Sequence, residues 1–325
     1  MLDGTPELTD VLDARRVIAP HLDPTPLRDY PLLDELLAAD VLVKHENHLP
    51  TGAFKVRGGI NLVARLEPDA RAAGVYAAST GNHGQSVAYA ANLFGVAATI
   101  FVPRGANPVK VSSMRSLGAE VIEHGVDFDE ARERCAEVAA ERGARYVHSA
   151  DEPLLIAGVA TATLEVLERD PAVDAILVPV GGGSGAAAAC IAAKSIAREI
   201  EVIGVQAEAA PAAYRAWREG ALVEDSMRTF AEGLQTRVAF ALPQRILAEW
   251  LDDFVLVSDD ELRAATLRLI ELTRNLIEPA GAAPLAGALR LRERLAGRRV
   301  ALICSGGNIS PPQLRELLAW EAGGG

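Results

Sequence analysis

The stretch DAILVPVGGGSGAAAACIAAKSIAREIEVIGVQA, residues 174–207, decides the fold class. It contains an apolar segment, a glycine-rich turn, an alanine-rich segment of helical length and a second apolar segment. The short apolar runs predict buried strands, and the longer run between them predicts a helix. A strand, a helix and a strand in this order predict two parallel strands joined by a crossover helix.

The same alternation extends over most of the chain and predicts an α/β fold built on parallel strands. Residues 208–257 interrupt it with several glycines and prolines, so a partly helical excursion is expected there. Further strands are predicted at 41–46, 75–79, 98–103, 119–124 and 300–305, and helices at 82–94, 127–142, 153–168 and 260–276.

Composition narrows the class of function. The chain has 325 residues, half of them hydrophobic, and a formal net charge of -12. An acidic chain without a basic run is not expected to bind nucleic acid, so a small molecule is the expected partner. The three cysteines lie far apart and indicate neither a disulfide framework nor a zinc site. No membrane span and no leader pattern in residues 1–10 are found, so a cytoplasmic location is expected.

The loops that follow strands are where an open parallel sheet binds ligands, and four motifs stand in such loops. The first is ENHLPTGAFKVRGG, residues 46–59, which places Lys55 at an expected helix start. An isolated lysine is usually solvated. A lysine that burial deprives of its proton is able instead to form a Schiff base and to act as a base.

The second motif, residues 79–85 with the sequence STGNHGQ, follows a predicted strand and opens a predicted helix. Taken alone it predicts a helix N-cap, with Ser79 or Thr80 accepting hydrogen bonds from free amides. The same amides would also suit a carboxylate ligand.

The third motif is the turn GGGSG, residues 181–185, inside the crossover unit. Glycines let the backbone approach a phosphate closely, and the start of a helix adds amide donors. The turn also satisfies a dinucleotide fingerprint through Ala186, with Glu208 at a suitable distance downstream. A third interpretation is that the glycines serve the geometry of the turn alone.

The fourth motif, CSGGN at residues 304–308, follows the last predicted strand, and EPAGA at 278–282 is a weaker fifth element. A lone SGGN is usually a simple turn. Cys304 is expected to be a buried neighbour rather than a nucleophile, because the sequence supplies no partner base for it.

In this order, from residue 46 to residue 308, the motifs resemble those of fold-type II pyridoxal 5′-phosphate enzymes of the serine/threonine dehydratase family. The resemblance implies that Lys55 is the catalytic lysine and holds the cofactor as a Schiff base. It implies that the glycine turn cradles the cofactor phosphate and that the loop at residue 79 receives the substrate carboxylate. The implied cofactor contacts are Lys55, Phe54, Asn82, Gly181, Gly182, Gly183, Ser184, Gly185, Glu278 and Ser305, and the implied substrate contacts are Ser79, Thr80, Gly81, Asn82 and His83.

The family's architecture, similar to that of the tryptophan synthase β chain, has two open, twisted, mostly parallel sheets flanked by helices. The resemblance implies a large cofactor-binding domain from residues 1–72 and 151–325, and a small domain, 73–150, that carries the asparagine loop. The cofactor would lie between them. The family also implies a homodimer.

The implied reaction is α,β-elimination, which converts L-threonine or L-serine into 2-oxobutyrate or pyruvate and ammonia. Lys55 would remove the α-proton, and a neutral Ser305 at the pyridine nitrogen would favour elimination over transamination. Other β-substituted amino acids, such as 3-hydroxyaspartate or phenylserine, stay open. A β-replacing synthase carries K-D-R after its lysine, whereas Val56 follows Lys55 here. An oxidoreductase would explain only the glycine turn, and a binding module without cofactor would leave Lys55 unexplained.

Three departures from the family pattern bear on function. Thr80 stands where serine racemases carry an acid/base serine, so racemisation is not favoured. Gln206, Ala210 and Ala212 occupy positions where the family binds a divalent metal, so no metal is expected, since Mg²⁺ and Ca²⁺ require oxygen ligands. Residues 158–162, GVATA, replace the family's G-Q-G-T, so substrate choice is open to change.

Overall fold

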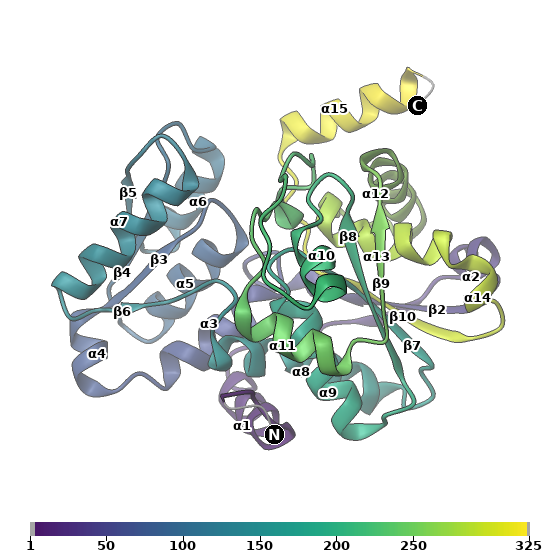
Figure 1. The fold of residues 1–325 in the computed structure, drawn as a ribbon, viewed down its shortest axis with the longest axis horizontal. Helices are drawn as coiled ribbons and strands as arrows, with labels where there is room; N and C mark the ends of the chain where they lie inside the picture. Colours follow the sequence, from purple (N-terminus) through teal and green to yellow (C-terminus); the bar gives the residue numbers. More distant parts are fainter. Residues whose placement is uncertain (1–3, 324–325) are drawn as a thin grey trace.

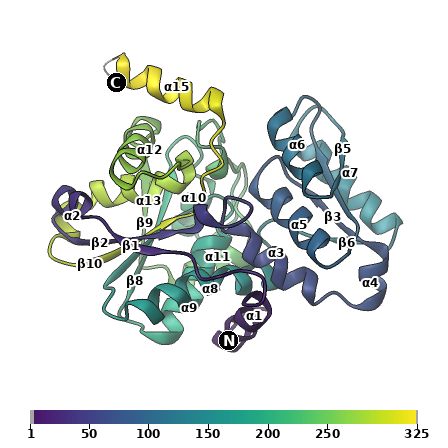
Figure 2. The ribbon, with the colours of Figure 1, turned by 180° about the vertical axis from the view of Figure 1, so that it is seen from behind.

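The computed structural model describes residues 4–323 of the chain. It contains two sheets, each packed between helices, with α1 (Leu8–Ile18) and α3 (Lys55–Ala64) lying between the sheets in both views (Figures 1 and 2). The predicted α/β class with two open, mostly parallel sheets is confirmed. No helix within residues 4–323 is long and apolar enough to cross a membrane.

The larger sheet has six strands in the order β1-β2-β10-β7-β8-β9. β1 runs antiparallel to β2, and every other neighbouring pair is parallel. Because β2 and β10 pair directly, segments near both ends of the chain share this sheet. The strands are β1 (Leu27–Asp29), β2 (Asp40–His45), β7 (Ala175–Pro179), β8 (Glu201–Ala207), β9 (Asp253–Val257) and β10 (Arg299–Cys304).

The smaller sheet has four parallel strands in the order β5-β4-β3-β6. One face packs on α7 (Phe128–Glu141) and the other on α3 and α5 (Asn82–Leu93), with α1 and the start of α8 joining the same core. The strands are β3 (Val75–Ala78), β4 (Ala98–Val102), β5 (Glu120–Glu123) and β6 (Arg145–Tyr146).

The larger sheet is covered by α8 (Pro153–Arg169), α9 (Ser184–Ile196) and α11 (Ala241–Trp250) on one face. On its other face lie α2 (Pro31–Leu37), α12 (Asp259–Thr273) and α13 (Pro279–Arg290). The last helix, α15 (Pro311–Ala322), projects from the body in Figure 1. The short helices are η1 (Glu46–His48), α4 (Pro68–Ala73), α6 (Pro108–Ser116), α10 (Ala212–Glu219), η2 (Glu232–Leu234) and α14 (Arg292–Leu295).

The predicted strands are confirmed, but the expectation for 208–257 was incomplete. That excursion ends in β9, which pairs with β8 at the edge of the larger sheet. β9 gave a weak signal because Phe254 and Val257 are its buried residues and the other three are partly exposed. The helix predicted over 260–276 ends earlier, at Thr273, because Arg274 takes the left-handed conformation with φ 60°.

Glycines let α3 and α8 cross at very short distance. A Cβ at Gly58 would lie 2.8 Å from the carbonyl oxygen of Leu155, and a Cβ at Gly158 would lie 2.8 Å from the Cα of Gly58. Both distances are shorter than real Cβ atoms tolerate against backbone. The two glycines therefore allow the helix that begins at Lys55 to rest directly on α8.

We expect Gly158→Ala to lower the melting temperature, although alanine is favoured over glycine in a helix by about 1 kcal/mol. The backbone of α3 cannot move aside as a side chain can, and overpacking of a core costs about 1–3 kcal/mol. Thermal unfolding measures the effect. Ser195→Ala, at an exposed position of α9, is the control and should unfold like the unmodified protein. A higher melting temperature for Gly158→Ala would contradict the close crossing.

Candidate active site

A cleft with a cavity volume of about 280 Å³ is lined by loops from both sheets. These loops follow β3, β7 and β10, so the cleft lies at the carboxyl ends of parallel strands, where such sheets bind ligands. Every site residue predicted from the sequence lines it, namely Phe54, Lys55, Ser79, Thr80, Gly81, Asn82, His83, Gly181, Gly182, Gly183, Ser184, Gly185, Glu278 and Ser305.

Lys55 is the first residue of α3, and its side chain lines the cleft. Its Nζ donates hydrogen bonds to the carbonyl oxygen of Ser149 at 2.9 Å and to Oγ of Ser184 at 2.8 Å. Burial lowers the pKa of Lys55 to about 8, because desolvation disfavours the ammonium form. At neutral pH a far larger fraction of this amine is uncharged than of an ordinary lysine, which suits both a nucleophile and a base.

The glycine turn ends in the first residues of α9 and presents free amides to the cleft. The first helical bond runs from Ala187 N to Gly183 O, so the amides of the three preceding residues have no backbone partner among the described residues. Glycine is required here, because Gly183 has φ +88° and a Cβ at Gly181 would lie 2.5 Å from Gly233 O. Such a helix start binds a phosphate well.

The structure does not support the dinucleotide interpretation of the same turn. Glu208, which would bind a ribose, lies outside the cleft lining and accepts a hydrogen bond from Arg290 Nη2 at 2.8 Å. Glu208 is also exposed and pairs with an arginine on α13. The residue needed for a dinucleotide is therefore engaged elsewhere.

The loop at residue 79 leads into α5, which begins at Asn82 with Gly81 as its N-cap. No side chain caps this helix, so the predicted N-cap role of Ser79 or Thr80 was wrong. Ser79 Oγ instead accepts a hydrogen bond from Gly81 N at 3.2 Å. The first amides of α5 thus stay available, and the positive end of the helix dipole adds to their attraction for an anion.

His83 has a defined tautomer in this arrangement. Its Nε2 lies 3.1 Å from the carbonyl oxygen of Val147, which only accepts, so Nε2 carries a proton. Burial lowers the pKa of His83 to about 3, so the ring is neutral and Nδ1 is an acceptor, without a partner in the described chain. The imidazole ring therefore has no N–H left to donate to a carboxylate. The backbone N–H of His83 can still donate to one.

Asn82 joins three motifs through its side chain. Its Nδ2 donates to Glu278 Oε1 at 2.8 Å, and its Oδ1 accepts from Asn308 Nδ2 at 2.7 Å. Burial raises the pKa of Glu278. One hydrogen on Asn82 Nδ2 remains free for a ligand. Asn308 was not named as a site residue from the sequence, although the SGGN motif contains it.

Ser305 and Phe54 come from opposite ends of the chain and meet in the cleft. Phe54 N donates to the carbonyl oxygen of Ser305 at 3.0 Å, and Ala53 forms an antiparallel bridge with Gly306. Lys55 Nζ lies 5.2 Å from the centroid of the Phe54 ring. The lysine motif and the SGGN motif therefore form one continuous surface.

Lys110 and Glu232 also line the cleft, and neither gave a signal in the sequence. Lys110 on α6 forms an ion pair with Glu232 on η2, and this pair joins the smaller sheet's helices to the segment beside the larger sheet. Gln313 Nε2 on α15 donates to Glu232 Oε1 at 2.7 Å. An ion pair between segments so far apart follows no periodic pattern, so only the fold reveals it.

The region of the family's metal site has a different use here. Gln206 is fully buried, and its Oε1 accepts a hydrogen bond from Tyr214 N at 2.9 Å near the start of α10. Ala210 and Ala212 are buried and offer no carboxylate. Within residues 4–323 no group of three or more His, Cys, Asp or Glu side chains is arranged to hold a metal.

The donor set of the cleft fits the cofactor that the sequence implies. The free amides at the start of α9 suit a phosphate, and their glycine cradle leaves room where a side chain would collide with Gly233. Lys55 supplies an amine for an aldehyde, and Ser305 supplies a neutral hydroxyl for a ring nitrogen. The amides of α5 form a second anion site, which suits an amino-acid carboxylate.

Known proteins show where this arrangement belongs. The family model described as pyridoxal-phosphate dependent enzyme matches residues 18–306. The chain is 38% identical to the L-threonine ammonia-lyase of Thermotoga maritima over 93% of this chain and 75% of that protein. It is 34% identical to the L-threo-3-hydroxyaspartate ammonia-lyase of Saccharomyces cerevisiae over 98% of both. The crystal structure of T.th. threonine deaminase is similar with a TM-score of 0.89, at 38% identity over 94% of this chain and 99% of that one.

The family match over residues 18–306 shows dependence on pyridoxal phosphate, and relatives above 30% identity over nearly the whole chain agree with it. The glycine turn with its free amides, the buried lysine and the uncapped start of α5 fit one cofactor and one class of substrate together. The chain belongs to the pyridoxal-phosphate dependent enzymes, in their serine/threonine dehydratase family, and it is an ammonia-lyase.

Proposed function

We propose that this enzyme dehydrates and deaminates L-threonine or L-serine to a 2-oxo acid and ammonia, with Lys55 as its catalytic lysine. The observation that carries the proposal is the position of Lys55 Nζ, 2.8 Å from Ser184 Oγ at the start of one helix, in the cleft that the start of a second helix also lines. The similarity to the threonine ammonia-lyase of Thermotoga maritima supports the choice of substrate.

Pyridoxal phosphate, when bound, withdraws electrons from the substrate's α-carbon. Lys55 is the group of the cleft that is suited to take the α-proton, because its lowered pKa keeps a fraction of the amine uncharged at neutral pH. In the uncharged amine the two N–H groups of Nζ donate to Ser149 O and Ser184 Oγ, which fixes the direction of the remaining lone pair. Lys55 therefore acts as both anchor and base.

The two helix starts divide the recognition of anions. The amides at the start of α9, with the glycines 181–183, hold the cofactor phosphate. The amides at the start of α5, with Ser79 and Thr80 beside them, hold the substrate carboxylate. Asn82 would offer its free N–H to the cofactor, and Ser305 would offer a neutral hydroxyl to the ring nitrogen.

A second candidate substrate is 3-hydroxyaspartate, on which the Saccharomyces cerevisiae relative acts according to its name. A smaller cavity of about 70 Å³ adjoins the cleft and is lined by Arg132 and Arg237. Both arginines face Asp129, at 3.4 and 3.7 Å, so a second substrate carboxylate would have to compete with it. This competition makes threonine and serine the preferred proposal.

We further propose that residues 73–150 form a small domain that closes on a large domain of residues 1–72 and 151–325. The ion pair between Lys110 and Glu232 supports a contact between them that forms across the cleft. A homodimer and a cytoplasmic location are proposed on the family resemblance.

The proposed function is tested with a panel of L-serine, L-threonine, 3-hydroxyaspartate and phenylserine, by measuring release of 2-oxo acid. We expect turnover of serine or threonine. Lys55→Ala should abolish it while the protein still unfolds cooperatively, because both anchor and base are lost. Substantial turnover by Lys55→Ala would refute the assignment of Lys55, and activity on 3-hydroxyaspartate alone would favour the second candidate.

Capture of the cofactor should depend on pH in a way that follows Lys55. Only the uncharged amine attacks an aldehyde, so the rate should rise about tenfold per pH unit below the pKa and level off above it. With the pKa of Lys55 at about 8, the plateau is expected near pH 8 to 9. Absorbance of the protein-bound cofactor follows the rate, and Nα-acetyl-lysine is the reference. A midpoint as high as that of the reference would contradict a desolvated Lys55.

Treatment with EDTA should leave the activity nearly unchanged. Gln206 serves as a hydrogen-bond acceptor near the start of α10, and Ala210 and Ala212 provide no carboxylate ligand for Mg²⁺ or Ca²⁺. Initial rates before and after chelation, and after addition of Mg²⁺, measure this. Loss of activity that Mg²⁺ restores would show that other oxygen ligands have taken over the site.

A further inference from the structure

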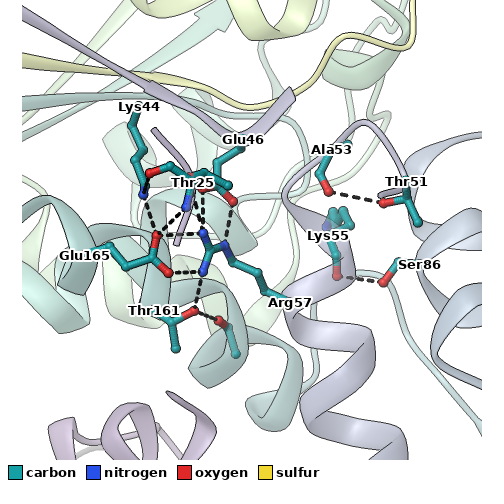
Figure 3. A network of polar contacts seen from close by, with 11 residues as sticks. Thr25, Lys44, Glu46, Thr51, Ala53, Lys55, Arg57, Ser86, Thr161 and Glu165 are labelled. Atoms are coloured by element: carbon teal, nitrogen blue, oxygen red, sulfur yellow. Dashed lines mark hydrogen bonds and ion pairs between the residues drawn. The ribbon is translucent and has the colours of Figure 1, made fainter. Parts of the chain in front are cut away.

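A cluster of four charged side chains, three of them buried and one partly buried, lies directly behind Lys55, and the reaction proposed above does not use it. It consists of Lys44, Glu46, Arg57 and Glu165, and we call it the charge cluster (Figure 3). Side-chain exposure is 1% for Arg57 and Lys44, 0% for Glu46 and 14% for Glu165. Two positive and two negative groups make the cluster neutral as a whole.

Arg57 is the centre of the cluster, and its guanidinium holds both carboxylates in paired hydrogen bonds. Nε and Nη2 donate to Glu46 at 2.6 and 2.8 Å, while Nη1 and Nη2 donate to Glu165 at 2.6 and 2.9 Å. Nη1 also donates to Thr161 Oγ1 at 3.1 Å. All five N–H groups therefore have acceptors, which fixes the plane of the guanidinium in all directions.

The two carboxylates that accept from Arg57 belong to two other elements, one on each side of the guanidinium. Glu46 lies in η1 directly after β2, Glu165 lies on α8, and Lys44 on β2 binds Glu165 and also donates to Thr25 O at 2.8 Å. A helix turns by about 100° per residue, so residues 55 and 57 point to nearly opposite sides of α3. Figure 3 shows the charge cluster on one side of the start of α3 and the bond from Ser86 to Lys55 on the other.

We propose that Arg57 is a positioning residue for Lys55. Its hydrogen bonds to Glu46 on one side and to Glu165 on the other fix the first turn of α3 in rotation about the helix axis and in position along it. They thereby fix the point at which the Lys55 amine enters the cleft. This rests on the proposed function of Lys55. Stability alone is a poor reason for such a cluster, because apolar side chains of similar volume often stabilise a core equally well. The pKa of Lys55 is lowered by burial and not by the charges of the cluster. Because the charge cluster is also neutral as a whole, we infer that it acts on Lys55 through geometry and not through its electric field.

The test compares the holoenzyme of Arg57→Lys, which keeps the charge but loses the paired hydrogen bonds, with that of Arg57→Met, which loses both. Leu37→Ala is the control, since Leu37 is fully buried on the far face of the larger sheet. The measurements are melting temperature, kcat and KM, and the visible circular dichroism of the bound cofactor divided by its absorbance, which reports how rigidly the cofactor is oriented.

We expect all three variants to melt at lower temperature. Only the Arg57 variants should lose visible circular dichroism per bound cofactor. Their kcat should fall by roughly 100-fold while KM changes little, because a small displacement of a reacting group lowers the rate by about that factor. Arg57→Lys should not rescue either property. If Arg57→Met does not fold, Glu165→Gln, which weakens one of the two grips at a less buried position, should show the same changes to a smaller degree.

The positioning role is overturned if Arg57→Lys or Glu165→Gln melts like Leu37→Ala but retains the kcat and circular dichroism of the unmodified protein. The cluster would then serve stability alone. Failure of the proposed function looks different, because the unmodified protein would then carry no lysine-bound cofactor, or Lys55→Ala would stay active. That result would overturn the role of Lys55 and of Arg57 together.

Discussion

The first turn of α3 is the constraint on which the rest of the site depends, because it is held from several directions at once. Phe54 N binds Ser305 O at 3.0 Å, and Ser86 Oγ binds the carbonyl oxygen of Lys55 at 2.6 Å. Behind it, Gly58 lies against α8 at a distance that admits no side chain. On the side of α3 all of these contacts are made by backbone atoms, so they leave Lys55 little freedom at its Cα.

The anion sites proposed for this acidic protein consist of backbone amides rather than of cationic side chains. Two helices, α5 and α9, begin at the cleft, and neither has a side-chain cap. An uncapped helix start costs stability unless its amides find another acceptor. A bound phosphate and a bound carboxylate, as proposed above, would supply the missing acceptors and offset this loss of stability. Of the lysine and arginine side chains that line the cleft, Lys55 is the proposed reacting group and Lys110 is paired with Glu232.

The polar network around Asn82 shows how distant motifs come to act together. Glu278 and Asn308 hold the two ends of the Asn82 amide, and Asn308 also donates to Thr51 O at 2.8 Å in the lysine motif. The asparagine loop belongs to the smaller sheet, whereas Glu278 and Asn308 lie beside the larger one. A movement of the loop would therefore have to break or carry along these bonds, which couples any closure of the cleft to the orientation of Asn82.

Sequence alone determined the α/β class and the motif residues that line the cleft. Parallel strands of one sheet bring their carboxyl ends to one edge, so the motifs 181–185 and 304–308, which follow the neighbouring strands β7 and β10, meet there. The helix starts at Lys55, Asn82 and Ser184 could also be predicted from the sequence, because turn residues and apolar periodicity are local signals.

Only the tertiary structure decided how these residues are bonded. The neutral tautomer of His83 depends on Val147 O, and the partner of Lys110 is more than a hundred residues away in the chain, at Glu232. In the sequence Arg57 is simply part of the lysine motif, yet its proposed role follows from Glu46 on η1 and Glu165 on α8, which the fold brings to it. Such contacts carry no period or spacing, since each depends on which helix happens to pack against which strand.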